Sequence, residues 1–352
     1  MKSTTRESEA ESPACNRPKP GTSPATSCSG AFVSWARLRR ADTIAERLGI
    51  PSHTVKYFYR GTPPLLTALK YAMQTLRTFW LLVLHRPKVV FVTNPPVFAI
   101  IPVFVYSCLF RARYVIDFHS GCFVEEHWRR WDWLQRFFAR RAVTNLVHNA
   151  DNAEVLEPWG APHLVFPSLP PDVSTPGGEV IPASGPSMGH RPRAVYICSF
   201  KSDEPVEVFL EAAKALPDVD FFVTGKAPRE LSSSIPQNVS LTGFLSECDY
   251  NQLLAGSDLV IALTTRTGTL LYGAQEAISL GKPLVLSRTS TLERVFTGGA
   301  VFAENTPQAL SACIRHALES CTQLAASMRD FRTRYVAEGE ARLAELRAVA
   351  GI

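Results

Sequence analysis

The strongest constraint on the fold is an alternation of short apolar runs with longer helical stretches, which occurs twice along the 352 residues. Strand–helix alternation of this kind produces a parallel sheet covered by helices on both faces. Residues 169–193 separate the two repeats and contain six prolines and four glycines, a composition typical of a linker. The sequence therefore predicts an α/β fold with two Rossmann-like domains that face a cleft, where ligands bind beyond the carboxyl ends of the strands.

Each repeat supplies six candidate strands, recognised as short apolar runs bounded by turn residues. The N-terminal set comprises 31–35, 53–59, 88–93, 114–118, 144–147 and 163–166. The C-terminal set comprises 194–200, 220–224, 239–244, 259–264, 283–287 and 300–303. Helices are expected near 41–49, 64–84, 97–110, 130–141 and 151–158, between the later strands, and over 306–348.

These elements define an N-terminal domain over 30–168 and a C-terminal domain over 194–325, joined by the linker. Residues 326–352 are predicted to form a C-terminal helix that packs near the domain junction. Residues 1–29 are rich in Ser, Thr, Pro and Glu and lack an apolar run, so we predict a disordered tail there.

The tail and the cysteines indicate the cellular compartment. The tail has no apolar stretch of a secretory signal, and Glu7, Glu9 and Glu11 argue against an organelle transit peptide. The eight cysteines include no C-x-x-C pair, which argues against a zinc ribbon or a disulfide-stapled secreted scaffold. These features predict a cytoplasmic protein.

An uncharged stretch of 22 residues, 89–110, is long enough to span a membrane. The sequence Thr93-Asn94-Pro95-Pro96 interrupts it after a run of strand length, and proline is well tolerated in the first turn of a helix. We therefore predict a buried strand, a turn and a buried helix.

Charge is unevenly divided between the two halves of the chain. Residues 31–168 carry 17 Lys and Arg against 9 Asp and Glu, whereas residues 194–352 carry 14 against 18. A basic half joined to a mildly acidic half indicates that the first half meets an anionic partner. Nucleic acid is not expected, because no recognised binding motif accompanies the charge.

Five arginines, three tryptophans and two phenylalanines fall within residues 128–141. A basic, aromatic, amphipathic helix suits an anionic membrane surface, where Trp lies at the interface and Arg meets phosphates. The same pattern also fits a domain helix with an apolar core face and a solvated basic face. The candidate membrane residues are Trp128, Arg129, Arg130, Trp131, Arg140 and Arg141.

Two N-terminal segments are candidate sites. Gly30 and the cationic loop after the first strand, with Arg37, are expected to approach an acceptor or a phosphate, or alternatively to form a solvated turn. Alternation along a later strand places Asp117 and His119 on one side. Together they would accept a proton from an acceptor hydroxyl or bind a donor sugar, and both are candidate catalytic residues. The alternative for Asp117 is a carboxylate that orders a loop.

The most informative stretch of the C-terminal half is a glycine loop that leads into a helix. Gly268 precedes a helix expected over Thr269–Leu280, where free N–H groups and the helix dipole favour an anion such as a diphosphate. Glu276 lies on this helix, and its carboxylate would accept hydrogen bonds from paired sugar hydroxyls. The alternative is a solvated helix residue.

The order of these motifs resembles a known family. A strand ending in Gly-Phe, "SD" before an apolar strand, the glycine loop, "EA…GKPLV" and a "TP…L…I" helix resemble the C-terminal domain of GT-B glycosyltransferases of family 4, group 1. The resemblance covers about residues 190–320. The N-terminal half, with "VTNPPVFA" and "RYVIDFHSG", resembles more loosely the transferases of exopolysaccharide and lipid-linked sugar synthesis.

The resemblance implies roles for particular residues. Glu276 matches the second Glu of the Glu-x7-Glu signature, which holds the nucleotide ribose, whereas Gly268 stands where the first Glu is expected. In this family, a His in the position of His119 lies beside the donor sugar. The implied ligands of the donor diphosphate are the amides of Gly268, Thr269 and Leu270 with the cations Lys201 and Arg266.

The resemblance thus implies a metal-independent glycosyltransferase, expected to transfer a hexose, that needs no cofactor besides its NDP-sugar donor substrate. Its acceptor would be lipid-linked or a growing polysaccharide at the inner face of the membrane, where the protein would be peripheral. Two alternatives remain open: an NDP-sugar epimerase of the same fold, and a non-catalytic scaffold subunit. The second follows from Gly268, which removes an expected acid.

Overall fold

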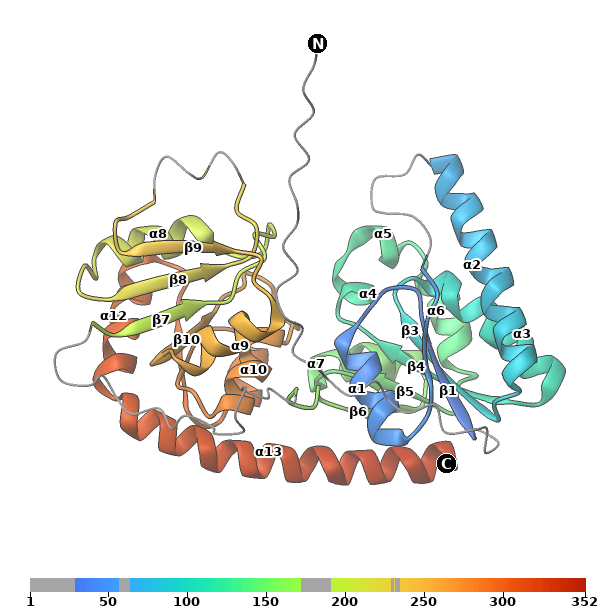
Figure 1. The fold of residues 1–352 in the computed structure, drawn as a ribbon. Coiled ribbons are helices and arrows are strands. Elements are labelled where there is room, and N and C mark those ends of the chain that lie inside the picture. The colour runs from blue at the N-terminus through green and yellow to red at the C-terminus, as the bar shows by residue number, and fades with distance from the viewer. Residues whose placement is uncertain (1–28, 57–63, 172–190, 229–230, 232–234) are drawn as a thin grey trace, which may run out of the picture.

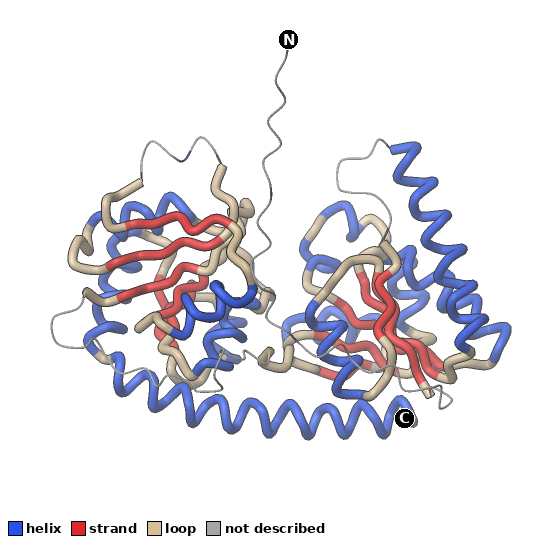
Figure 2. The backbone as a smooth tube through the Cα atoms, in the orientation of Figure 1, coloured by secondary structure: helices blue, strands red, loops and turns tan. Residues whose placement is uncertain are grey.

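The computed structural model describes residues 29–56, 64–171, 191–228, 231 and 235–352. Two domains lie side by side, each built on a six-stranded parallel sheet with helices on both faces (Figures 1 and 2). This confirms the predicted α/β class with two Rossmann-like domains. The predicted tail up to residue 28, the linker over 172–190 and the end of the expected second strand, 57–59, lie outside the described residues.

The N-terminal sheet has the strand order β2-β1-β3-β4-β5-β6. Its strands are β1 (Gly30–Ser34), β2 (Ser52–Thr54), β3 (Val89–Asn94), β4 (Arg113–Phe118), β5 (Thr144–Val147) and β6 (His163–Val165). Its helices are α1 (Arg39–Leu48), α2 (Pro64–His85), η1 (Val97–Ala99), α3 (Ile100–Phe110), α4 (Gly121–Val124), α5 (Glu126–Arg129), α6 (Asp132–Ala139), α7 (Ala150–Leu156) and η2 (Glu157–Trp159).

The C-terminal sheet has the strand order β12-β11-β10-β7-β8-β9. Its strands are β7 (Arg193–Tyr196), β8 (Asp220–Thr224), β9 (Val239–Gly243), β10 (Leu259–Ala262), β11 (Leu284–Ser287) and β12 (Ala300–Ala303). The helices are α8 (Val206–Lys214), α9 (Glu247–Ala255), α10 (Tyr272–Leu280), α11 (Ser290–Val295), α12 (Pro307–Glu319) and α13 (Cys321–Ala350).

The uncharged stretch 89–110 forms β3, the turn η1 and α3, as predicted. Every residue of β3 is buried, because strands at the centre of a parallel sheet are covered on both faces. Among the helices of the described residues, none combines the length and the apolar character that crossing a membrane requires.

Helix α13 crosses beneath both domains (Figure 1). Its first half contributes Met328 and Phe331 to the core of the C-terminal domain, and its second half contributes Leu343 and Leu346 to the core of the N-terminal domain. The helix has 30 residues and begins at Cys321, five residues before the expected start at 326. At about 1.5 Å per residue it extends for about 45 Å and holds the two domains through apolar contacts at both ends.

Candidate active site

A cavity of about 540 Å³ opens at the carboxyl ends of the C-terminal strands, and the start of α10 forms part of its wall. This is where a sheet of this type binds its ligands. Arg39, at the start of α1, reaches the cavity from the other domain. The described residues that line it also include Ser199, Lys201, Asp203, Glu204, Gly225, Phe244, Glu247, Tyr250, Arg266, Thr269, Tyr272, Gly273 and Glu276.

Glu276 lies in this cavity with 4% of its surface exposed. The Tyr250 hydroxyl donates a hydrogen bond of 2.5 Å to its Oε2, and Arg39 Nη1 lies 3.5 Å from its Oε1. Burial raises the pKa of Glu276, while the Tyr250 hydrogen bond and the Arg39 charge act in the opposite direction.

The loop before α10 differs from the prediction. The helix begins at Tyr272 instead of Thr269, because Leu271 keeps an extended backbone conformation. The N–H of Gly268 donates to Thr291 Oγ1, and its carbonyl accepts hydrogen bonds from Ser120 and Asn149 of the other domain.

The diphosphate assignment of the Gly268 N–H is therefore wrong, because this group is already bonded to Thr291 and the carbonyl faces the other domain. The side chain of Leu270 packs against the C-terminal core, but this does not test the role of its N–H group, which stays a prediction. Of the three predicted loop residues, the described lining of the cavity includes Thr269 alone.

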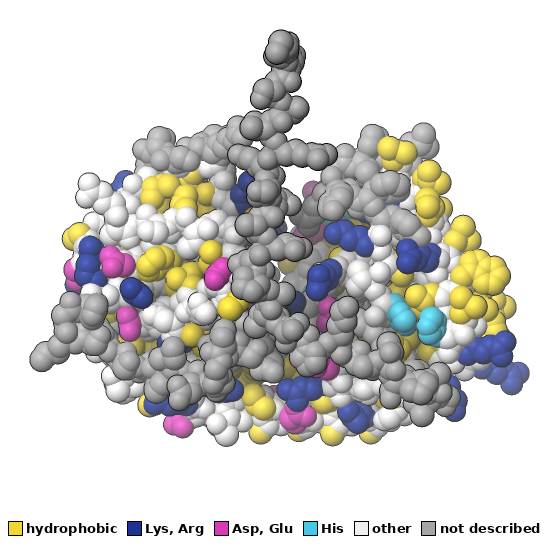
Figure 3. All heavy atoms as spheres, in the orientation of Figure 1, with side chains coloured by type: hydrophobic (Ala, Val, Ile, Leu, Met, Phe, Trp, Pro, Cys, Tyr) yellow, Lys and Arg dark blue, Asp and Glu magenta, His cyan; other side chains and the backbone are white. Residues whose placement is uncertain are grey.

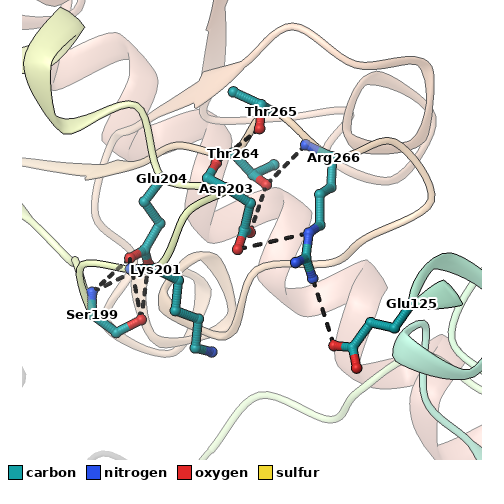
Figure 4. Close-up of polar contacts among 8 residues, drawn as sticks. All are labelled: Glu125, Ser199, Lys201, Asp203, Glu204, Thr264, Thr265 and Arg266. Carbon is teal, nitrogen blue, oxygen red and sulfur yellow. Dashed lines mark hydrogen bonds and ion pairs between the residues drawn. The ribbon is translucent and has the colours of Figure 1, made fainter. Parts of the chain in front are cut away.

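The loop after β7 is held by the carboxylate of Glu204 (Figure 4). Glu204 accepts hydrogen bonds from the backbone N–H groups of Ser199 and Lys201 and from the Ser199 hydroxyl. Such adjacent N–H groups are also suited to bind an anionic ligand. The side chain of Lys201 remains exposed and lines the cavity, as the diphosphate assignment requires.

Arg266 also lines the cavity, but two carboxylates lie near it (Figure 4). Its Nε is 3.7 Å from Asp203 Oδ1, and its Nη1 is 3.9 Å from Glu125 Oε1 of the other domain. Among the described residues that line the cavity, four are acids and three are cations. Its described charged residues are the cations Arg39, Lys201 and Arg266 and the acids Asp203, Glu204, Glu247 and Glu276.

Replacement of Glu204 tests this balance of charge. In Glu204→Gln the carbonyl oxygen still accepts the loop hydrogen bonds, while one negative charge beside the ligand is removed. We expect a nucleoside diphosphate, the kind of ligand that the resemblance implies, to bind about three- to tenfold more tightly, since like charges at close range oppose each other. Calorimetric titration would measure this, with Glu207→Gln, an exposed site on α8, as the control for net charge. Weaker binding by Glu204→Gln would show that loop order matters more than charge.

Asp117 has a different environment from the one predicted. It is fully buried, and Arg40 Nε lies 3.0 Å from its Oδ1 and 3.3 Å from its Oδ2. Burial alone would raise the pKa of Asp117, but the charge of Arg40 and the nearby imidazoles of His119 and His148 outweigh it and hold the pKa well below its usual range. A carboxylate so held is a poor proton acceptor, which favours the alternative of a carboxylate that orders a loop. The catalytic assignment of Asp117 stays a prediction.

His119 lies on the same side of β4 as Asp117, as the alternation predicted, with its Nε2 at 3.2 Å from Asp117 Oδ2. Its side chain is 21% exposed, and the neighbouring Ser120 hydroxyl bonds to Gly268 across the cleft. His119 therefore lies close to the domain boundary, where a ligand can reach it. Its catalytic role stays a prediction.

A second imidazole belongs to His148, which follows β5. The centroids of the His148 and His119 rings are 4.7 Å apart. The ligand atoms of Asp117, His119 and His148 lie within 4.8 Å of one another, a spacing that suits a metal ion. The guanidinium of Arg40 already occupies Asp117, so a metal ion here would meet a fixed positive charge. The group fits a metal poorly.

His148 gives the N-terminal domain a pH dependence. Burial, together with the charges of Arg40 and His119, lowers its pKa well below the ordinary 6.5. Below about pH 6.5 the unfolded chain therefore binds a proton that the folded chain refuses, and stability falls by up to about 1.4 kcal/mol per pH unit. Urea unfolding at pH 7 and pH 5 should show this loss, and it should shrink in His148→Gln. An equal loss in both proteins would contradict the assignment.

The two residues predicted for an acceptor or phosphate loop, Gly30 and Arg37, have different outcomes. Gly30 is the first residue of β1 and pairs with Val89, so it lies at the amino end of the sheet, opposite the edge where ligands bind. Its assignment to an acceptor or phosphate loop is wrong. Arg37 is exposed on the loop after β1, but the described residues lining the cavity do not include it. The neighbouring Arg39 and Arg40 point to the cavity and to the core.

The predicted membrane helix is divided between α5 and α6 at Trp131, whose backbone leaves the helical conformation. Trp128 and Trp131 pack against Phe98, with ring centroids 6.5 and 4.9 Å apart, and both are half-buried. Both rings therefore pack against the core while remaining partly exposed, and their assignment to the membrane surface stays a prediction. The remaining four residues of that set, Arg129, Arg130, Arg140 and Arg141, are exposed, and their contact with a membrane stays a prediction.

Sequence reasoning missed several residues of the cavity. Tyr250 and Tyr272 lie beside Glu276, and Phe244, which is 83% exposed, lines the cavity after β9. Gly225 lies opposite with φ 86°, and a Cβ there would lie 2.3 Å from the Cys198 carbonyl oxygen, so only glycine fits. The one signal of these residues in the sequence was a pair of glycines, Gly225 directly after β8 and Gly243 at the end of β9.

This architecture, two Rossmann-like domains with a ligand cavity between them, defines the GT-B class, and solved structures agree. Sucrose-phosphate synthase from Thermosynechococcus elongatus has a TM-score of 0.70 at 10% identity, over 91% of this chain and 98% of that chain. Anabaena Alr3699/HepE in complex with UDP and glucose has a TM-score of 0.67 at 13% identity, over 91% and 99%. A putative UDP-N-acetylglucosamine 2-epimerase from Listeria monocytogenes has a TM-score of 0.59 at 12% identity, over 86% and 90%.

A family match covers most of the C-terminal domain. Residues 191–320 match the family described as glycosyl transferases group 1. Comparison with curated proteins gives no match in sequence. At 10 to 13% identity the solved structures establish the fold alone.

Proposed function

We propose that this protein is a metal-independent glycosyltransferase that moves a sugar, expected to be a hexose, from an NDP-sugar to a lipid-linked or polysaccharide acceptor. The observation that carries the proposal is the buried Glu276 in a cavity at the strand ends of a group 1 domain. Its carboxylate, flanked by Tyr250 and Arg39, is suited to bind the paired hydroxyls of a ribose.

The start of α10 supplies the setting for the leaving diphosphate. Tyr272 and Gly273 begin this nine-residue helix and line the cavity. Free N–H groups and the helix dipole there favour an anion, and Lys201 and Arg266 would add positive charge as the bond to the sugar breaks. Gly273 is required, because a Cβ would lie 2.9 Å from Ile197.

Two further residues would complete the donor site. The exposed ring of Phe244 offers a stacking surface for the nucleotide base. His119, partly exposed near the cleft, would hydrogen-bond the donor sugar or the acceptor hydroxyl. The solved structure of HepE, which has a similar fold, is a complex with UDP and glucose, so UDP is the first nucleotide to test.

Two experiments test the proposal on the full chain. Thermal unfolding in the presence of UDP, GDP and other nucleoside diphosphates should show a rise in Tm for one of them, since a ligand that binds only the folded state stabilises it. Hydrolysis of a panel of NDP-sugars should then identify the donor. The proposal fails if none of the nucleotides raises Tm.

A non-catalytic scaffold of the same fold is the second candidate. Glu204 occupies the amides of the β7 loop, and Gly268 leaves the cavity without an acid expected for the donor sugar. A scaffold would show neither a rise in Tm nor hydrolysis. An epimerase, the third candidate, would bind nucleotide but convert the NDP-sugar into its epimer without an acceptor. Product analysis by NMR separates the three.

The place of action is also part of the proposal. The basic N-terminal domain, with an excess of eight positive charges over residues 31–168, would bring the protein to the inner face of an anionic membrane, where lipid-linked acceptors lie. We propose a cytoplasmic protein that associates peripherally with this surface.

A further inference from the structure

Helix α2 is amphipathic in an unusual sense, because polar side chains lie on its buried face. Gln74 and Thr78 are fully buried: Gln74 Nε2 donates to the carbonyl of Val55, and Thr78 Oγ1 accepts from Trp35 Nε1. These bonds fix which side of α2 faces the domain.

The opposite face of α2 is apolar and exposed. Trp80 is 60% exposed and Leu84 is 76% exposed. Exposed apolar residues recur every three or four positions from Leu66 to Leu84, so they form one stripe along the helix. Helix α3 packs beside α2 and adds three more exposed apolar side chains. We call this set the α2–α3 face: Leu66, Leu69, Met73, Leu76, Trp80, Leu84, Val105, Leu109 and Phe110.

Figure 3 shows hydrophobic side chains gathered along the outer edge of the N-terminal domain, where α2 and α3 lie in Figure 1. Exposed apolar area of this extent is uncommon on a monomeric soluble protein and marks an interaction surface. The α2–α3 face is therefore a candidate docking surface.

The charge of the surrounding chain indicates what that partner is. Residues 47–116 contain nine Lys and Arg and no Asp or Glu. A hollow of about 380 Å³ at the end of the α2–α3 face includes Phe110 and four cations, and none of its described lining residues is acidic. The four cations are Arg86, Lys88, Arg111 and Arg113, and we call this group the cationic hollow.

We propose that the α2–α3 face docks onto an anionic lipid bilayer, with the apolar stripe in the interfacial layer and the cationic hollow on lipid phosphates. Large apolar side chains beside a cluster of Lys and Arg are the combination that an anionic bilayer surface binds. From Leu66 to Leu84 the stripe extends for about 27 Å, so α2 lies flat on the membrane along its length.

Other occupants fit less well. A second copy of the chain, docked through the same face, would offer the cationic hollow no anionic partner, because residues 47–116 contain no Asp or Glu. The tail over 1–28 holds only isolated apolar residues and cannot cover the stripe. The docking surface lies outside the segment 128–141 that the sequence suggested. It determines where the proposed transferase works, but it does not depend on that activity.

Sedimentation with vesicles tests the proposal on the full chain. Vesicles of equal parts phosphatidylglycerol and phosphatidylcholine should bind the protein, whereas vesicles of phosphatidylcholine alone should bind it at least about tenfold more weakly. The triple variant L76S/W80S/L84S should lose binding by at least about tenfold. The control V155S/V349S, also at exposed apolar sites, should bind as the unaltered protein does.

A second pair of variants locates the charge. R86Q/K88Q/R111Q/R113Q should lose at least about tenfold in binding, and R129Q/R130Q/R140Q/R141Q, which removes the same charge from the same domain, should lose less. Equal losses, or a larger loss in the second variant, overturn the cationic hollow. The protein could also bind neither kind of vesicle and form a dimer, which the triple variant L76S/W80S/L84S dissociates. That result would overturn the proposal of a bilayer in favour of a second copy of the chain. Neither result bears on the nucleotide-induced rise in Tm.

Discussion

Arg40→Gln should lower the free energy of unfolding by about 3–5 kcal/mol, because it leaves the carboxylate of Asp117 buried without its cation. Arg40 is 6% exposed and Asp117 is fully buried. Arg40 also donates to the Ser168 hydroxyl and to the carbonyl of Phe166, so its loss leaves further acceptors unsatisfied. Urea unfolding followed by circular dichroism at pH 7 measures the difference.

The neighbouring arginine is the matched control. Arg39 is exposed, and its contact with Glu276 is a loose 3.5 Å, so Arg39→Gln should change the free energy of unfolding by less than about 0.5 kcal/mol. The double variant R40Q/D117N, which removes the buried charge as well, should be more stable than Arg40→Gln alone. If Arg40→Gln unfolds like Arg39→Gln, the ion pair contributes little and Asp117 is free for another role.

The central strands of the sheets were predictable because they are buried on both faces. Val89–Asn94 reads as a continuous apolar run ending in Thr-Asn, and such a run has few alternatives inside an α/β domain. Helix ends were less predictable. Leu271 stays extended where the sequence suggested that α10 had begun, and nothing in its residue type requires this conformation.

The site was less predictable, because its partners are distant in sequence. Arg40 and Asp117 are 77 residues apart, and Arg39 and Glu276 are 237 apart and belong to different domains. Two consecutive arginines begin α1, yet one is buried and the other faces the cavity. The sequence shows the charge of this segment, whereas the direction of each side chain depends on the packing of α1 against the sheet.

The donor cavity shows the same limit in its electrostatics. The sequence predicted a position lacking an acid, Gly268, but not that Glu204 would bond the amides of its own loop. The described acids around the cavity balance or exceed its cations. A dianionic diphosphate must therefore rely on the start of α10 and on the side chain of Lys201 more than on net charge.

Glu276→Ala should lower the affinity for the nucleoside diphosphate by about ten- to a hundredfold and abolish the rise in Tm at moderate nucleotide concentrations. A carboxylate that accepts two ribose hydroxyls contributes about 1.5–3 kcal/mol through charged hydrogen bonds, and about 1.4 kcal/mol corresponds to tenfold in affinity. Tyr250→Phe, which leaves the carboxylate in place, should lose less than about tenfold. Calorimetric titration measures both.

The stability of the same variant without nucleotide is a separate readout. Burial raises the pKa of Glu276, which means that the ionised carboxylate is disfavoured where it lies. Folded-state stability should therefore change little in Glu276→Ala, since the cost of burying the charge disappears along with its hydrogen bond from Tyr250. Loss of nucleotide binding together with a large loss of stability would mean that Glu276 holds the domain together. Loss of binding alone would identify it as a residue kept for the ligand.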